Sequence, residues 1–189
     1  MTAEVCCERI KNLKQVKEIK MVWTVIILGV LLDQLTKIWV AANLPYETPI
    51  PIIGNIFSLD YIHNEGAAWS ILSGRVGFLL VITVLVTVVI AYLLYKTPKD
   101  QKLLRFSFAL LIAGALGNII DRVRLGYVID FLRFPDFPIF NIADCFVTVS
   151  IALIVILTLI DVKKESDAKK AATAQVSAQS GRKAKKKQQ

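Results

Sequence analysis

Long apolar stretches alternate along this chain with short polar or basic ones. Four stretches approach the length of about 20 apolar residues that a membrane-spanning helix needs. They are residues 22–42, 76–95, 103–120 and 144–160. The pattern predicts an all-α membrane protein with four transmembrane helices, in which residues 21–160 form a single membrane domain.

The first apolar stretch follows a polar, basic segment, residues 1–20, as the apolar part of a secretory signal peptide does. That part of a signal peptide is only about half as long as residues 22–42. We therefore expect an uncleaved helix preceded by a basic cytoplasmic extension.

Residues 56–62 lie in the connection between the first two helices and change from helical to alternating hydrophobicity. Phe57, Leu59 and Tyr61 fall on one side of an extended chain. This alternation predicts a small β-strand segment at the membrane surface. The segment N-E-G-A-A-W follows at residues 64–69.

In that segment, Gly66, Ala67 and Ala68 would let another backbone approach closely. Trp69 suits the membrane interface, where the ring of tryptophan is favoured.

Composition supports a membrane protein and locates the excess charge. The chain of 189 residues is 55% hydrophobic and carries a formal net charge of +8; its mean hydropathy is +0.57. Nine of the cations but only two of the acids follow Val162. We therefore interpret residues 161–189 as a disordered Lys-rich tail beside the anionic cytoplasmic leaflet, and we expect no nucleic-acid partner.

Lys and Arg placement orients the helices. Basic clusters precede the first helix, fill the connection at residues 96–105 and follow the fourth helix. Both termini are therefore predicted to be cytoplasmic and residues 43–75 to lie outside. Three cations of the last connection, Arg122, Arg124 and Arg133, oppose this assignment.

Polar side chains inside the apolar stretches sort to the predicted outer half of the membrane, where charged groups are costly and usually functional. Asp33 and Lys37 are spaced i and i+4, so that they can pair, and a purely structural ion pair is one reading of them. The other members of this group are Asn64, Asn118, Asp121, Arg122, Asn141 and Asp144.

Spacing places several of these residues on common helix faces. Gly114, Asn118 and Asp121 share one face of the third helix. Asn141 suits an N-cap with Asp144 in the first turn of the fourth helix, so capping alone could explain both. It does not explain Asp130, which lies in an apolar, strand-like segment.

Carboxylates gathered at one membrane surface permit several chemistries. Two could share a proton and activate water, as in aspartic proteases; here Asp144 could pair with either Asp121 or Asp130. A proton-coupled carrier and a structural scaffold are the alternatives from other classes. We expect neither a metal nor a cofactor, because too few ligands are available.

The cysteines give no framework for disulfides or zinc. Cys6 and Cys7 are interpreted as free thiols, with acylation as an alternative. A mechanism using Cys145 and His63, the only histidine, is the weaker nucleophilic alternative.

Five blocks in order resemble the bacterial lipoprotein signal peptidase family, also called signal peptidase II. They are D-Q-L-T-K at Asp33, N-E-G-A-A-W at Asn64, G-A-L-G-N-I-I-D-R at Gly114, V-I-D-F at Val128 and F-N-I-A-D at Phe140. The resemblance covers residues 21–160 and leaves the two basic ends outside it.

The resemblance implies an aspartic endopeptidase of the cytoplasmic membrane that removes signal peptides from prolipoproteins, cutting before a diacylglyceryl-modified cysteine. Its catalytic pair falls on Asp130 and Asp144. Its supporting residues fall on Asp33, Lys37, Asn64, Gly66, Asn118, Asp121, Arg122 and Asn141. The expected enzyme is a monomer that contacts membrane lipids and has its active site at the extracytoplasmic surface.

Overall fold

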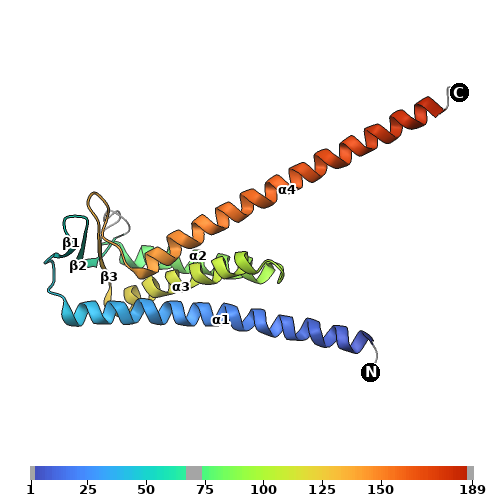
Figure 1. Ribbon diagram of the computed structural model, residues 1–189. Coiled ribbons are helices and arrows are strands. Elements are labelled where there is room, and N and C mark those ends of the chain that lie inside the picture. The colour runs from blue at the N-terminus through green and yellow to red at the C-terminus, as the bar shows by residue number, and fades with distance from the viewer. Residues whose placement is uncertain (1–2, 67–73, 187–189) are drawn as a thin grey trace. The chain divides into compact units, whose positions relative to one another are not determined.

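Four long helices dominate the part of the chain that the structure describes. The computed structural model describes the backbone of residues 3–66 and 74–186 and the side chains of residues 19–66 and 74–170. The helices are α1 (Ala3–Asn43), α2 (Val76–Lys96), α3 (Lys102–Leu125) and α4 (Ile142–Lys186). Figure 1 labels the four helices and colours the chain from its N-terminus to its C-terminus. The expected close backbone approach at Ala67 and Ala68 and the interfacial position of Trp69 lie outside the described residues.

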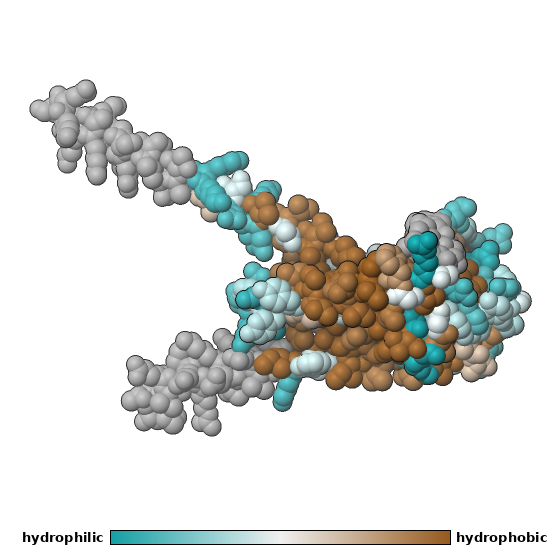
Figure 2. All heavy atoms as spheres, turned by 180° about the vertical axis from the view of Figure 1, so that it is seen from behind, coloured by the Kyte–Doolittle hydropathy of each residue, from teal (hydrophilic) through white to brown (hydrophobic). Residues whose placement is uncertain are grey.

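Each helix contains a stretch that is long and apolar enough to cross a membrane. These stretches are Ile19–Asn43, Val76–Lys96, Lys102–Leu125 and Ile142–Lys170. Only 6% of the apolar window of α2 is buried, against 44% of that of α3. Figure 2 shows the resulting apolar surface between polar residues. Because such a surface would be unstable in water, the four predicted spans are confirmed as membrane helices.

The third helix lies at the centre of this packing because its inner face carries small residues. It packs against both α1 and α2. A Cβ atom at Gly114 would collide with the backbone oxygen of Ala143 in α4, and one at Gly117 would collide with the carboxylate of Asp33 in α1. Glycine at these two positions therefore allows α1, α3 and the start of α4 to approach closely.

A three-stranded antiparallel sheet lies beyond the C-terminal end of α1 (Figure 1). Its strands are β1 (Ile50–Ile53), β2 (Phe57–Asn64) and β3 (Val128–Arg133), in the order β1-β2-β3. The predicted strand segment in the first connection is confirmed. The last connection supplies β3, and its pairing with β2 places Asn64 opposite Val128 and Ile62 opposite Asp130.

The two ends of the chain differ from the expected pattern. Helix α1 already begins at Ala3, and α4 continues as helix through Lys186, where the sequence predicts disorder. Lysine, alanine, glutamate and glutamine are strong helix formers. Exposed pairs such as Lys169 and Glu165, 3.1 Å apart, add a little to helix stability. Residues 152–189 form a compact unit of their own. The assignment of residues 1–20, 21–160 and 161–189 as extension, membrane domain and tail stays a prediction.

Candidate active site

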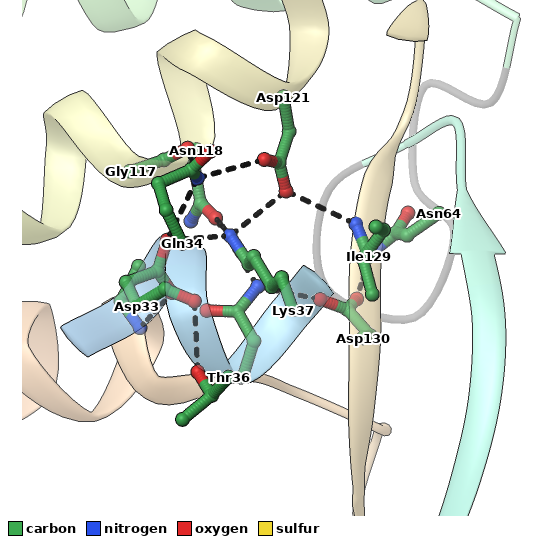
Figure 3. Close-up of polar contacts among 12 residues, drawn as sticks. Asp33, Gln34, Thr36, Lys37, Asn64, Gly117, Asn118, Asp121, Ile129 and Asp130 are labelled. Carbon is green, nitrogen blue, oxygen red and sulfur yellow. Dashed lines mark hydrogen bonds and ion pairs between the residues drawn. The ribbon is translucent and has the colours of Figure 1, made fainter. Parts of the chain in front are cut away.

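The site begins with a buried ion cluster between α1 and α3. The Lys37 ammonium lies 3.0 Å from Asp33 Oδ2 and 2.9 Å from Asp121 Oδ2. It also donates a 3.0 Å hydrogen bond to Asn118 Oδ1. Asp33, Lys37 and Asp121 are only 0%, 1% and 2% exposed. Figure 3 shows this arrangement. The predicted pair of Asp33 and Lys37 is thus confirmed, and Asp121 completes it.

The two carboxylates of this cluster also hold backbone groups. Asp33 Oδ1 accepts a 2.9 Å hydrogen bond from the N–H of Ala143, in the first turn of α4. Asp121 Oδ2 accepts one of 3.2 Å from the N–H of Ile129 in β3. A carboxylate at a helix N-terminus is favoured by the helix dipole. The cluster therefore positions both segments that follow α3.

Asn141 and Asp144 form a reciprocal cap at the start of α4. Asn141 Oδ1 accepts a 3.0 Å hydrogen bond from the backbone N–H of Asp144. The backbone N–H of Asn141 donates one of 3.2 Å to Asp144 Oδ2. This is the geometry of a capping box. The predicted N-cap is confirmed, and it leaves the side-chain amide nitrogen of Asn141 free to bond elsewhere.

Amide side chains link Asp144 to Asp130. Asn118 Nδ2 donates a 2.8 Å hydrogen bond to Asp144 Oδ1. Asn141 Nδ2 donates to both Asn118 Oδ1, at 3.1 Å, and Asp130 Oδ1, at 2.7 Å. Asn64 Nδ2 reaches Asp130 Oδ2 at 2.7 Å. Every carboxylate oxygen of Asp130 and Asp144 thus accepts a hydrogen bond, which fixes the orientation of both groups.

Both carboxylates line one cavity of about 570 Å³. Its polar side is formed by Asn64, Gly66, Asn118, Arg122, Asp130 and Asp144. Its other walls are largely apolar and include Phe140 and Val147. A cavity with a few converging polar groups and apolar walls is typical of a ligand-binding or active site.

The environment of Asp130 favours its protonated form. Its side chain is in β3, outside the membrane-spanning helices, and the residue is only 1% exposed. Burial, and then the charge of Asp144, raise the pKa of Asp130 to about 7. The hydrogen bonds from Asn64 and Asn141 oppose this shift and are smaller effects. Two carboxylates with one proton between them can act as an acid and a base.

Sequence alone leaves either Asp121 or Asp130 as the partner of Asp144. In the structure, Asp121 is occupied by Lys37, by the N–H of Ile129 and by Gln34 Nε2 at 2.9 Å. It does not line the cavity that Asp130 and Asp144 share. Asp130 is therefore the carboxylate that the fold brings to Asp144.

The remaining predicted residues surround this pair. The N–H of Gly66 donates a 2.9 Å hydrogen bond to Asn64 Oδ1, and its carbonyl accepts one of 3.3 Å from Arg122 Nη2. Asn64 and Arg122 are thereby tied to the same short segment. Gly66 and Arg122 also line the cavity.

The cysteine alternative finds little support in this geometry. Cys145 lines the cavity, but His63 does not. His63 Nε2 is 2.8 Å from the hydroxyl oxygen of Tyr61, and its ring stacks on that of Tyr127 with centroids 3.8 Å apart. Within the described residues, no group of three His, Cys, Asp or Glu side chains could hold a metal ion.

Sequence reasoning missed two residues of the cluster, Gln34 and Gly117. Gln34 Nε2 donates to Asp121 Oδ1, to the carbonyl oxygen of Gly117 and, at 3.2 Å, to Asp33 Oδ2. An amide inside an apolar span was the available signal for Gln34. The spacing of Gly114 and Gly117 on one helix face was the signal for Gly117.

Comparison with known proteins identifies similar chains. A family model described as signal peptidase (SPase) II matches residues 25–160. The lipoprotein signal peptidase of Latilactobacillus sakei subsp. sakei (strain 23K) is 44% identical over 147 residues, covering 75% of this chain and 97% of that protein. That of Halothermothrix orenii is 43% identical over 136 residues, covering 72% and 93%.

A solved structure has the same fold. A bacterial membrane enzyme, determined by the in meso method at 2.3 Å resolution, superposes with a TM-score of 0.74 and 35% sequence identity. The match covers 77% of this chain and 92% of that one.

We expect Asp33→Asn to lower the amount of folded protein. Lys37 would lose one of its two buried counter-ions and the N-terminus of α4 its carboxylate, at a cost on the order of 3 kcal/mol. The measurement is the thermal unfolding midpoint in detergent. Asp161→Asn is the matched control, because Asp161 pairs with Lys164 at an exposed site, with side chains 58% and 74% exposed. Equal midpoints for both variants would contradict a structural role for the buried cluster.

Proposed function

Since the chain belongs to the signal peptidase II family, we propose that it removes signal peptides from prolipoproteins by aspartic catalysis, with Asp130 and Asp144 as the catalytic pair. It cleaves on the N-terminal side of the diacylglyceryl-modified cysteine. The observation that carries this proposal is the cavity of about 570 Å³ in which these two carboxylates meet. Eight further residues are proposed to position this pair or to bind the substrate: Asp33, Lys37, Asn64, Gly66, Asn118, Asp121, Arg122 and Asn141.

The two carboxylates divide the chemistry according to their environments. Asp144, capped at the N-terminus of α4, acts as the base that takes a proton from water. The water oxygen attacks the scissile carbonyl carbon, while protonated Asp130 gives its proton to the carbonyl oxygen. Collapse of the resulting gem-diol intermediate breaks the C–N bond, the proton on Asp144 passes to the departing amine, and one hydroxyl of the diol returns its proton to Asp130.

The amides support this division because they orient the carboxylates without supplying a proton. Asn118 and Asn141 join Asp144 and Asp130 into one hydrogen-bonded unit that reaches Lys37. Preorganised groups of this kind need little reorganisation during reaction. Arg122, which also lines the cavity, places a positive charge beside the substrate path.

The substrate class fits the position of the cavity. A diacylglyceryl group keeps its acyl chains in hydrocarbon and holds the adjacent peptide bond at the bilayer surface. The apolar walls formed by residues such as Phe140 and Val147 suit a ligand that carries acyl chains. The enzyme acts as a monomer in the cytoplasmic membrane, with lipids rather than nucleic acid around it and its site on the extracytoplasmic side.

Replacing either catalytic carboxylate should abolish cleavage. Asp130→Asn and Asp144→Asn each substitute an amide that cannot exchange a proton at neutral pH, so we expect a loss of at least about 100-fold in rate. The assay is cleavage of a lipidated prolipoprotein by purified enzyme in detergent. Asp136→Asn is the control, because Asp136 is exposed at a turn with φ 58°, a conformation that Asn accepts. Near-normal turnover in either catalytic variant, at normal folded amounts, would refute the pair and favour a scaffold role.

The dependence of activity on pH should be bell-shaped. Asp130 must be protonated, and its pKa is about 7, so the rate should fall as pH rises above that value. At low pH the pair should carry two protons, so that neither carboxylate can take a proton from water and the rate should fall on that side as well. A flat acid limb would remove the shared-proton mechanism.

The same pKa affects the free energy of unfolding. The pKa of Asp130 is about 7 in the folded protein and about 4 in the unfolded chain, so between these pH values only the folded protein holds the proton. The free energy of unfolding should therefore decline as pH rises through this interval. Thermal unfolding of Asp130→Asn against pH should lack that part of the decline.

Cysteine labelling in cells tests the orientation in the membrane. A cysteine placed at Glu47, which is exposed, should react with an impermeant reagent added outside. One placed at Lys99, which is also exposed, should react only after the membrane is made permeable. The opposite result would place the active site on the cytoplasmic side.

A further inference from the structure

A second cavity lies at the other end of the helices from Asp130 and Asp144. It has a volume of about 370 Å³ and is formed by α1, α2 and α3. Its walls are almost entirely apolar and include Trp23, Leu94 and Ile112. The single charged residue in its lining is Arg105.

Arg105 is held in place but is not fully paired. The residue is only 7% exposed. Its Nη1 atom donates hydrogen bonds to the carbonyl oxygens of Leu94, at 3.0 Å, and Thr97, at 2.9 Å, which close the last turn of α2. Its Nε atom is buried and has no hydrogen-bond partner within the described residues. Because this atom is enclosed by protein, a ligand in the cavity interacts with the part of Arg105 that lines the cavity and with its positive charge.

The depth of this cavity is that of a lipid headgroup. Arg105 is in the first turns of α3 and Arg122 in its last turn, 17 residues further along, which is a rise of about 26 Å at 1.5 Å per residue. That separation is close to the hydrocarbon thickness of about 30 Å. If the polar site lies at one membrane surface, Arg105 lies near the other.

The surroundings of the cavity are positively charged. Exposed lysines surround it: Lys20 at the start of the apolar span of α1, and Lys96, Lys99 and Lys102 at the connection between α2 and α3. Asp100 is the only acid between Lys96 and Arg105. Basic groups at a membrane surface attract anionic lipids.

We propose that this cavity binds one anionic phospholipid, with its phosphate beside the guanidinium of Arg105 and an acyl chain along Trp23, Leu94 and Ile112. Apolar walls and one incompletely paired guanidinium suit a ligand that is both amphipathic and anionic. A soluble anion would leave the apolar walls uncovered. The headgroup of a zwitterionic lipid carries a positive charge, which the nearby lysines would repel.

The test measures which lipid stays with the protein. The full-length protein is reconstituted in nanodiscs of equal parts phosphatidylglycerol and phosphatidylcholine, extracted in detergent and examined by native mass spectrometry. We expect one retained phosphatidylglycerol, enriched about tenfold over phosphatidylcholine, because both lipids offer a phosphate but only phosphatidylcholine adds a positive charge near Arg105 and the lysines. Equal retention of the two lipids would overturn the proposal.

Three variants distinguish binding in this cavity from a general attraction of anionic lipids to the basic surface. Arg105→Gln should abolish the enrichment, whereas Lys99→Gln, which removes an exposed cation outside the cavity lining, should keep it. Ala91→Phe fills the cavity without removing the hydrogen bonds of Arg105 and should also abolish it, which gives a decisive result even where Arg105→Gln fails to fold. Enrichment that persists in Ala91→Phe would contradict the site. Displacement of the lipid by millimolar inorganic phosphate would show a phosphate site instead.

Discussion

A buried ammonium group, that of Lys37, determines how the rest of the site is assembled. A charge at this depth must be paired, because removing one partner of a buried pair costs on the order of 3–5 kcal/mol. Lys37 meets this requirement with Asp33 on its own helix and Asp121 on α3. Each carboxylate then uses another oxygen lone pair for a distant backbone N–H, that of Ala143 or Ile129. One charge thus fixes α1, α3, β3 and the start of α4 in a single arrangement.

The proposed catalytic pair is built outward from that cluster through amides rather than through further charges. Asn118 contacts Lys37 with its oxygen and Asp144 with its nitrogen, and Asn141 continues the connection to Asp130. Amides can donate and accept without changing protonation, so they fix geometry while leaving the proton to the carboxylates. Burial then distinguishes the two acids, because Asp130 lies deep in β3 whereas Asp144 caps a helix that opens on the cavity.

The two ends of α3 each carry polar residues that line a different cavity. At its C-terminal end, Asn118 and Arg122 line the polar cavity where the proposed substrate bond is cut. At its N-terminal end, Arg105 closes the last turn of α2 and borders the apolar cavity. Because α3 is the most buried of the four spans, it can hold polar groups at both ends while α2 exposes its apolar surface to lipid.

Features that depend on local periodicity could be predicted from the sequence. Hydropathy located the four spans, the i, i+4 spacing paired Asp33 with Lys37, and the order of polar residues before α4 indicated the cap formed by Asn141 and Asp144. Contacts between distant segments could not be predicted in this way. Residue spacing left Asp121 and Asp130 as equal partners for Asp144, because that choice depends on which carboxylate Lys37 takes and on how β3 pairs with β2. Only the tertiary structure decides both, since hydrogen bonds between segments far apart in the chain leave no periodic pattern within either segment.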